Sequence, residues 1–436
     1  MLPVIYIAFH FPPRGGAGVQ RSLKFVKYLP AFGVRPLVVT GNHEPNARGL
    51  TDPSLHQEIP SSIQVLRTLW TFDRQSCGKR EHAAQVDRIA EIVSSENPAC
   101  IVVSMSPFTD SRLAADLAHR LSVPWVADLR DPWALDEFQV YPTAIHRLIT
   151  LRRMRDELRS ARLVIMNTPE AAKLYNEKIG ASPNQRVVSI TNGYDADDFT
   201  CIGLLPKDPE HFEIVHNGSL LTEMGLRLRR RSLEHALLGR HLRGMDPLTR
   251  SHYFLVQAVK RLVERKPELA RVLRVSLIGK ARPVDREIIE KAGLTALFDL
   301  PGYLEHRESL QRLMRGDLLF FPMHNMPRTH RTSIVPGKLY EYMASGKPIL
   351  AAVPPGDARD FVEACGTGMV CAPDDVDAMC TCIEESITRW RQGLPYPRTN
   401  REFVEQFERR RLAQRLAEEL AALHPADSRR KQLAGI

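Results

Sequence analysis

Short apolar runs alternate with amphipathic helical segments through most of the 436 residues, and the alternation starts twice. The first series has strand-like runs at 4–9, 35–40, 101–104, 125–127, 163–166 and 187–190, and the second has them at 212–215, 272–278, 318–321, 349–352 and 369–371. Continuous apolar strands separated by helices are typical of a parallel sheet that helices cover on both faces. The pattern therefore predicts an α/β protein with two Rossmann-like, doubly wound domains.

The boundary between these domains is expected in a polar segment, 195–211, which has two prolines and little periodicity. We therefore expect an N-terminal domain over 1–200 and a C-terminal domain over 208–392. A long helix is predicted at 400–423, so that 393–436 forms a crossover helix and a tail. A basic insertion at about 223–248 interrupts the second domain after its first strand.

The formal net charge of +9 favours anionic partners, such as phosphorylated substrates or an anionic membrane surface. We find no zinc-finger, RRM or helix-turn-helix signature, so no nucleic-acid partner is expected. No apolar run reaches about 18 residues, and the apolar N-terminus lacks a basic leader. We expect a cytoplasmic protein. Two arginine-rich segments, 147–162 and 224–248, leave peripheral binding to the inner membrane face open, with a solvated basic face as the simpler alternative.

Two sequence features lie near strand ends of the predicted first domain. A glycine-rich stretch, 14–18, follows the first strand and permits close approach of an anionic ligand, although a tight strand–helix turn explains it more simply. The stretch Asp-Leu-Arg-Asp-Pro-Trp, 128–133, follows a short strand, where open α/β sheets bind ligands. A structural Asp–Arg pair that braces the loop is the alternative for this stretch.

The most informative segment is SIVPGKLYEYMASGKPILA, residues 333–351. A Pro-Gly loop leads into a short helix, and Lys338 and Glu341 share one face at its start. The helix N-terminus and Lys338 would hold a phosphate, while Glu341 would accept two hydrogen bonds from ribose hydroxyls. The segment therefore predicts a nucleoside diphosphate site, with a surface ion pair as the alternative.

In order and spacing, these segments resemble the retaining GT-B glycosyltransferases of family 4, the glycosyl transferases group 1, in a surface-polysaccharide subgroup with a DxRDPW motif. The resemblance spans nearly all of 1–390, through FHFPPRGGAGVQRSLKFVKYLPAFGVRPLVVTG, SMSPFTDSRLAADLAHRLSVPWVADLRDPW, NTPEAAKLY, ITNGYDADDF, IVHNGSL, SLIGK, LPGYL, KLYEYMASGKPILA and GDARDFVEACGTGMVCAPDD. It implies two Rossmann-like domains facing a central cleft and a C-terminal helix that crosses back to the first domain.

The same resemblance implies a function. A sugar would pass from a nucleotide-diphosphate donor to an acceptor hydroxyl with retention, in the biosynthesis of cell-surface polysaccharide or glycolipid. No metal and no further cofactor would be required, because Lys/Arg groups and a helix dipole stabilise the departing diphosphate. The implied partners are the nucleotide sugar and an unidentified acceptor, for which the basic charge and the resemblance suggest a lipid-linked or surface-polysaccharide molecule.

Site residues follow from the same resemblance, position by position. Catalytic roles are implied for Asp128, Arg130, Asp131, Lys338 and Glu341. Donor contacts are implied for Gly15, Gly16, Gly218, Ser219, Tyr303, Leu304, Ser333, Ile334, Val335, Lys338 and Glu341. The basic insertion obscures the usual Arg and Lys that bind the diphosphate, and the candidates are Arg227, Arg229, Arg230, Arg231 and Arg250.

Two departures from the family pattern concern the sugar end of the site. Many relatives have glutamates eight positions apart, whereas this chain has Ser333 at the first of these positions and Glu341 at the second. Many also have a histidine close to the place of Arg130. Two other functions therefore stay open: a nucleotide-sugar 2-epimerase of the same fold, and a non-catalytic, glycosyltransferase-like binding subunit.

Overall fold

The computed structural model describes residues 1–15, 17–41, 52, 54–68, 79–200, 202–203, 205–230, 237–240, 242 and 244–423. They form two compact units. The first comprises 1–136, 148–193 and the chain from 407 onward, and the second comprises 137–147 and 194–406. The stretch 137–147 thus belongs to the second unit, although it lies inside the range expected for the N-terminal domain.

A parallel sheet forms the centre of the first unit, with its described strands in the order β3-β2-β1-β4-β5-β6-β7. They are β1 (Leu2–Ala8), β2 (Val34–Gly41), β3 (Val65–Thr68), β4 (Cys100–Ser104), β5 (Trp125–Leu129), β6 (Leu163–Met166) and β7 (Arg186–Ser189). Ile5 and Ile7 of β1 enter the hydrophobic cluster on one face, while Val4 and Tyr6 enter the cluster on the other. Both faces are buried, which explains the continuous apolar runs.

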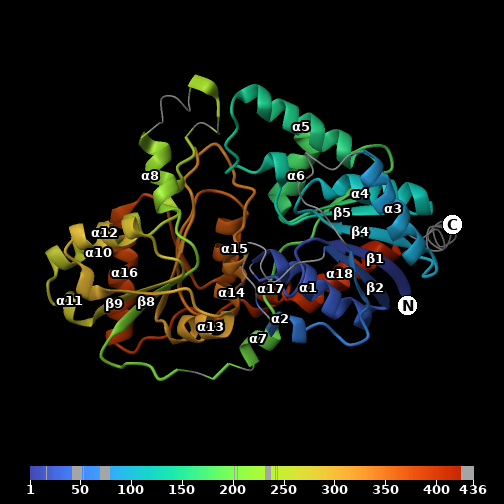
Figure 1. The fold of residues 1–436 in the computed structure, drawn as a ribbon. Helices are drawn as coiled ribbons and strands as arrows, with labels where there is room; N and C mark the ends of the chain where they lie inside the picture. Colours follow the sequence, from blue (N-terminus) through green and yellow to red (C-terminus); the bar gives the residue numbers. More distant parts are fainter. Residues whose placement is uncertain are drawn as a thin grey trace, which may run out of the picture. The chain divides into compact units, whose positions relative to one another are not determined.

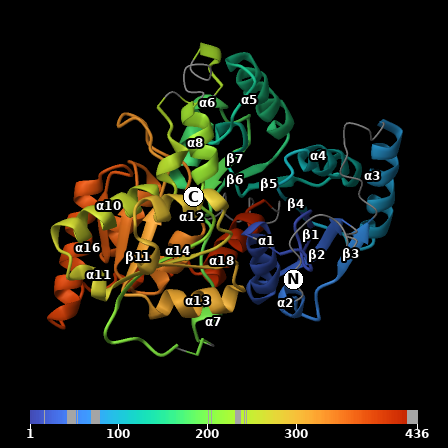
Figure 2. The ribbon, with the colours of Figure 1, turned by 60° about the vertical axis from the view of Figure 1, so that its left-hand side comes forward.

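Helices cover both faces of this sheet. They are α1 (Ala17–Tyr28), α2 (Ser54–Gln57), α3 (Lys79–Ser94), α4 (Asp110–Leu121), α5 (Ala144–Leu158), α6 (Pro169–Lys178) and α18 (Arg409–Ala421), with short 3-10 turns at Leu29–Phe32 and Trp133–Leu135. The first turn of α5 belongs to the second unit and the rest to the first. Helices α1 and α18 lie side by side (Figure 1, Figure 2), and Leu23, Val26, Leu412 and Leu416 share one cluster. The C-terminal helix therefore packs on the first unit, as predicted.

The final helix differs from the prediction because it is broken. Instead of one helix at 400–423, the chain forms α17 (Arg401–Glu405) and then α18. The Glu408 carboxylate accepts a hydrogen bond from the backbone N–H of Arg411 and so starts a new helix. Phe407 is buried, and its carbonyl oxygen would lie 2.0 Å from a Cβ on Gly193, so tertiary packing fixes the break.

The second unit is built around another parallel sheet, with its described strands in the order β10-β9-β8-β11-β12-β13. They are β8 (Phe212–Asn217), β9 (Leu273–Ile278), β10 (Phe298–Gly302), β11 (Leu318–Pro322), β12 (Ile349–Ala352) and β13 (Gly368–Cys371). The strand order reverses between β8 and β11, and ligands bind at such a switch point in open α/β sheets. The two sheets confirm the predicted pair of Rossmann-like domains.

The helices of the second unit lie on both sides of its sheet (Figure 1). They are α7 (Ala196–Thr200), α8 (Thr222–Arg230), α10 (Tyr253–Arg265), α11 (Leu269–Val272), α12 (Pro283–Lys291), α13 (His306–Arg315), α14 (Lys338–Ala344), α15 (Asp357–Cys365), α16 (Val376–Arg391) and α17, with 3-10 turns at Pro247–Thr249 and Thr295–Leu297. Helices α10 and α16 pack against each other over one hydrophobic cluster. Across the described ranges, no helix is both long and apolar enough to span a bilayer.

Candidate active site

At the carboxyl ends of β8 and β9, the residues that follow the two strands are glycines whose backbones are in direct contact. Gly218 follows β8 with φ +127°, and its N–H donates to the carbonyl oxygen of Ile278, 2.7 Å away. Gly279 follows β9 with φ +141°, and a Cβ there would lie 2.5 Å from the Gly218 oxygen. Only glycine accommodates such backbone angles at this spacing, so these two positions form a bare backbone floor next to the switch point at β8.

Lys338, the first residue of α14, extends over this floor. A Cβ on Gly218 would lie 2.1 Å from the Lys338 Nζ, so the glycine leaves the space that the ammonium group occupies. Burial, together with the positive charge of Arg250, lowers the pKa of Lys338 to about 7, while Glu341 opposes the shift. A desolvated ammonium beside a second cation is stabilised by an anion, so this position is suited to a phosphate group.

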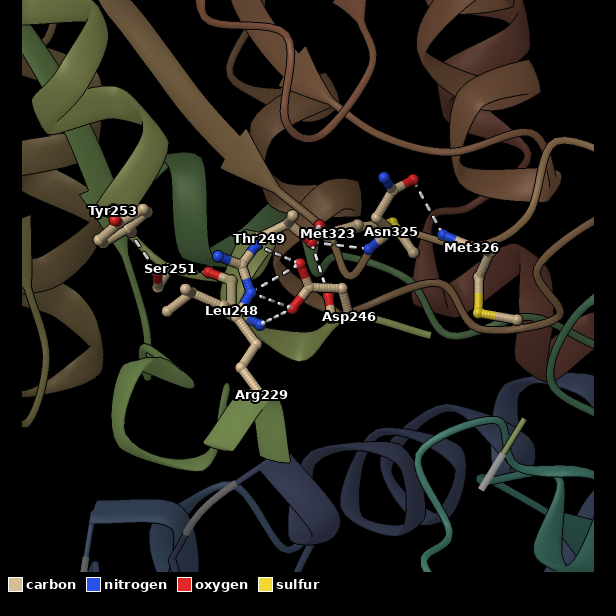
Figure 3. A network of polar contacts seen from close by, with 9 residues as sticks. All are labelled: Arg229, Asp246, Leu248, Thr249, Ser251, Tyr253, Met323, Asn325 and Met326. Atoms are coloured by element: carbon tan, nitrogen blue, oxygen red, sulfur yellow. Dashed lines mark hydrogen bonds and ion pairs between the residues drawn. The ribbon is translucent and has the colours of Figure 1, made fainter. Parts of the chain in front are cut away.

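A polar network fixes the chain at the end of the basic insertion, which carries Arg250. Figure 3 shows this network, which comprises Arg229, Asp246, Leu248, Thr249, Ser251, Tyr253, Met323, Asn325 and Met326. The backbone N–H of Asp246 donates to the Asn325 carbonyl at 3.0 Å, and the N–H of Asn325 donates to the Thr249 hydroxyl at 2.6 Å. The network attaches the chain around Arg250 to the end of β11, and the Arg250 guanidinium lies 5.0 Å from the Phe138 ring centre.

The arginine candidates of the basic insertion differ in their surroundings. Arg227, Arg229 and Arg230 are exposed on α8, Arg250 is partly buried, and Arg231 lies outside the described residues. Arg229 donates from Nε and Nη2 to the Asp246 carboxylate, which raises the pKa of its guanidinium. Its contacts therefore stabilise the insertion, and Arg250 is the described candidate that acts on Lys338.

Glu341 lies one turn after Lys338, with its side chain 23% exposed. The His306 Nε2 lies 3.9 Å from a Glu341 carboxylate oxygen and 3.3 Å from a carboxylate oxygen of Asp198. Glu341 thus keeps a solvent-accessible carboxylate near Lys338, as hydroxyl recognition requires.

The loop before α14 has a partner that the sequence did not indicate. The Ser333 N–H and hydroxyl both donate to the Glu137 carboxylate, at 2.6 and 3.2 Å. Ser333 and Val335 are buried, and Ile334 is partly buried. The Ser333 hydroxyl therefore contacts a protein carboxylate, rather than being held out for a sugar.

Three further predicted donor residues, Ser219, Tyr303 and Leu304, follow strands of the second unit. Ser219 is exposed directly after Gly218. Gly302 ends β10, and Tyr303 follows it with 56% of its surface exposed, next to a partly buried Leu304. An exposed aromatic ring at a strand end can pack against a planar base.

In the first unit, Asp128 forms a buried ion pair with Arg21 of α1. The Arg21 Nη2 lies 2.6 Å from Asp128 Oδ1, and the two side chains are 2% and 0% exposed. Arg21 also donates to the carbonyl oxygens of Thr191 and Ile190, at 2.7 and 2.9 Å. The stretch therefore contains a structural Asp–Arg pair of the kind considered from the sequence, and the arginine that pairs with Asp128 comes from α1.

Arg130 points in another direction, toward the start of α1. A Cβ on Gly18 would lie 1.7 Å from the Arg130 Nη1, and this buried nitrogen has no hydrogen-bond partner among the described residues. The Arg130 Nη2 donates to the Ser106 hydroxyl at 2.9 Å. The adjacent Asp131 is 54% exposed, and its Oδ2 lies 3.4 Å from the Arg130 Nε. Asp131 therefore stays accessible to a hydroxyl, whereas the Arg130 side chain is only 17% exposed and Asp128 is fully buried.

The glycine-rich stretch beside Arg130 lies between β1 and α1. Gly15 is partly exposed there, whereas Gly16 lies outside the described residues. The Arg14 guanidinium lies 4.5 Å from the Phe9 ring centre. A side chain at Gly18 would overlap the Arg130 guanidinium, so the glycine at this position has a packing role in the first unit.

Part of the chain is similar in sequence to a known protein family. Residues 243–389 match the family of glycosyl transferases group 1. No curated protein sequence matches the chain significantly. The matched segment includes Arg250, Lys338 and Glu341, and together with the two Rossmann-like sheets it supports a GT-B glycosyltransferase, an enzyme of glycosyl transfer.

Solved structures agree with this fold over almost the whole chain. A glycosyltransferase from Rickettsia africae aligns with a TM-score of 0.65 and 13% identity, covering 97% of this chain and 98% of that one. Anabaena HepE in complex with UDP-glucose aligns with a TM-score of 0.56 and 15% identity, covering 100% of both chains. A Listeria monocytogenes protein provisionally assigned as a UDP-N-acetylglucosamine 2-epimerase gives 0.50 and 14%, covering 95% and 94%. At these identities the likeness concerns the fold.

Proposed function

We propose that this protein transfers a sugar from a nucleotide-diphosphate donor to an acceptor hydroxyl with retention of configuration. The observation that carries the proposal is the Lys338 ammonium over the bare backbone of Gly218 at the end of β8, within electrostatic range of a second cation, Arg250. An ammonium group over a surface without side chains, with a second cation in electrostatic range, fits a diphosphate, which carries at least two negative charges and needs close backbone approach.

We assign described residues to the diphosphate, the ribose and the base of the donor. Lys338 and Arg250 stabilise the diphosphate as it leaves, without a metal ion. Helix α14 has only seven residues, so its dipole adds less than these two side chains do. Glu341 accepts hydrogen bonds from the ribose, and Tyr303 packs against the base. HepE, which shares the fold, has been solved with UDP-glucose, consistent with a nucleotide-sugar donor.

The acceptor side is assigned to the first unit. Arg130 and Asp131 are the residues of the 128–133 stretch that we expect to meet the acceptor or the transferred sugar, while Asp128 stabilises their surroundings through Arg21. Retention and a surface-polysaccharide or glycolipid acceptor rest on the resemblance to family 4.

The proposal is tested with a panel of nucleotide sugars. A bound donor raises the melting temperature by mass action, so the best donor is identified by its thermal shift and then assayed for transfer. An epimerase would convert this donor without an acceptor, and a non-catalytic subunit would bind it without turnover. The absence of a shift with every nucleotide sugar and every nucleoside diphosphate would overturn the proposal.

Glu341→Gln is expected to weaken donor binding at least tenfold, because hydrogen bonds to a charged group contribute about 1.5–3 kcal/mol. The dissociation constant of the nucleoside diphosphate is measured by calorimetry. Glu363→Gln is the matched control, since Glu363 is 52% exposed on α15 and pairs with Arg359 on the same helix. Equal affinity in wild type and the 341 variant would remove Glu341 from the site.

We further propose that the protein binds the surface of an anionic membrane through α5. Ile145, Leu148 and Ile149 share one helix face and are 66%, 58% and 55% exposed, while Arg147 and Arg152 flank them. Exposed aliphatic side chains can insert into the headgroup region while neighbouring arginines contact anionic lipids.

Cosedimentation with phosphatidylglycerol vesicles should therefore fall at high salt, and it should fall at low salt in the variant Leu148→Ser/Ile149→Ser. Vesicles of phosphatidylcholine alone are the control for surface charge. This membrane proposal would be contradicted if cosedimentation with phosphatidylglycerol vesicles changed neither with salt nor with the two substitutions.

A further inference from the structure

A buried carboxylate, Glu137, lies at the centre of a polar cluster in the second unit. Its side chain is 1% exposed. Oε1 accepts hydrogen bonds from the Ser333 N–H at 2.6 Å and from the His330 Nε2 at 3.4 Å, and Oε2 accepts from the His324 Nε2 at 3.0 Å. Such a set of donors is suited to an ionised carboxylate, which can only accept hydrogen bonds.

The charge of Glu137 persists despite its burial. Burial alone would raise its pKa, but the hydrogen bonds from His324, His330 and the Ser333 N–H outweigh this effect and lower the pKa to about 2. A carboxylate that stays ionised in the interior holds its donors more firmly than a neutral acceptor does. Glu137 therefore restrains the loop in which His330 and Ser333 lie.

The opposite side of this loop is restrained as well. The Thr332 N–H donates to the Pro355 carbonyl at 2.9 Å. A Cβ on Gly356 would lie 2.5 Å from the Thr332 oxygen, so the two backbones are in direct contact. The loop 330–335 is thus held between Glu137 and the chain after β12, immediately before Lys338 begins α14.

The next residue, Phe138, connects Glu137 with the second cation of the site. Its ring centre lies 4.1 Å from that of His324 and 5.0 Å from the Arg250 guanidinium carbon. One dipeptide therefore contacts both the loop that leads to Lys338 and the arginine beside Lys338. His330, with its side chain 31% exposed, is the member of the cluster that reaches the surface.

We propose that Glu137 is a positioning residue for the sugar end of the donor, acting through His330 and the backbone of the loop 330–335. The inference rests on the proposed transferase function. Many relatives have a glutamate where this chain has Ser333. Here we infer that Glu137, which follows the 128–133 stretch, supplies the carboxylate in its place, and the small Ser333 side chain leaves room for it. His330 and the loop backbone then meet the sugar hydroxyls.

The test separates the sugar from the nucleotide. Glu137→Gln keeps the shape of the side chain and removes its charge. We expect the KM for the nucleotide sugar to rise about tenfold, whereas the inhibition constant of the nucleoside diphosphate changes less than twofold. His330→Ala, at a partly exposed position where folding is not at risk, should change the two constants in the same way.

A relocation variant provides the positive control. Glu137→Ser should raise the KM for the nucleotide sugar. The double variant Glu137→Ser/Ser333→Glu should lower this KM again at least in part, because residue 333 then supplies a carboxylate to the position that Glu137 occupied. Melting temperatures in saturating nucleoside diphosphate report folding. Equal rises in both constants, or a lower melting temperature with an unchanged KM, would show a purely structural role and overturn the inference. If the wild type binds no nucleoside diphosphate, the proposed function fails instead, and the inference with it.

Discussion

Lys338→Met is expected to lower kcat/KM for transfer at least a hundredfold. The methionine keeps the length of the side chain over Gly218 but removes the charge that meets the departing diphosphate. Removal of one preorganised charge-stabilising donor typically costs about 10²–10³ in rate. Initial rates with the best donor give the ratio. Lys291→Met is the control, since Lys291 is 74% exposed on α12, and its rate should match that of the wild type.

The pH dependence of donor binding identifies the lysine independently of the rate. With a pKa of about 7 in the free protein, Lys338 is mostly neutral above pH 7 and must take up a proton when a diphosphate binds. The affinity of the wild type should therefore fall as pH rises from 7 to 9, by up to about tenfold per unit. The Lys338→Met variant should show no such fall. A wild-type affinity that does not change over this range would show that Lys338 stays protonated in the free protein, and the rate of Lys338→Met would then decide its role.

Much of the fold could be predicted because its strands are buried on both faces. The runs at 163–166 and 349–352 agree with β6 and β12 to the residue, since nothing but burial determines them. Strand β10 was not predicted, because Asp299 and Pro301 interrupt its apolar run and its register with β9 is irregular. The break before α18 escaped prediction for a different reason, because it depends on the packing of Phe407 against Gly193.

Residues of the candidate site could be predicted where their contacts are local in the sequence, and could not where the contacts are distant. Lys338 and Glu341 are neighbours on one helix turn, so their spacing in the sequence was sufficient to pair them. Arg250 stood among several arginines, and the network of Figure 3 that selects it joins the insertion to the end of β11. Glu137 was missed, because its partners lie 187 to 196 positions away. The sequence offers no periodic signal for such a contact.

Arg21→Met is expected to destabilise the first unit by about 3–5 kcal/mol, because it leaves the Asp128 carboxylate buried without its partner. Three side-chain hydrogen bonds to Asp128 and two to backbone carbonyls are lost together. Urea unfolding followed by circular dichroism gives the free energy. Arg35→Met is the control: Arg35 is 46% exposed in its pair with Glu96, and its loss should cost less than about 1 kcal/mol.

A second substitution shows whether the unpaired charge causes the loss. In Arg21→Met/Asp128→Leu, no charge stays buried, and two apolar side chains replace the pair within the core of the first unit. Part of the stability should return, since apolar replacements of buried ion pairs are often neutral or stabilising. Recovery should be incomplete, because the carbonyl oxygens of Ile190 and Thr191 still lack their donor. If the double variant is less stable than Arg21→Met alone, the unpaired Asp128 carboxylate is not the source of the loss, and the backbone hydrogen bonds from Arg21 are.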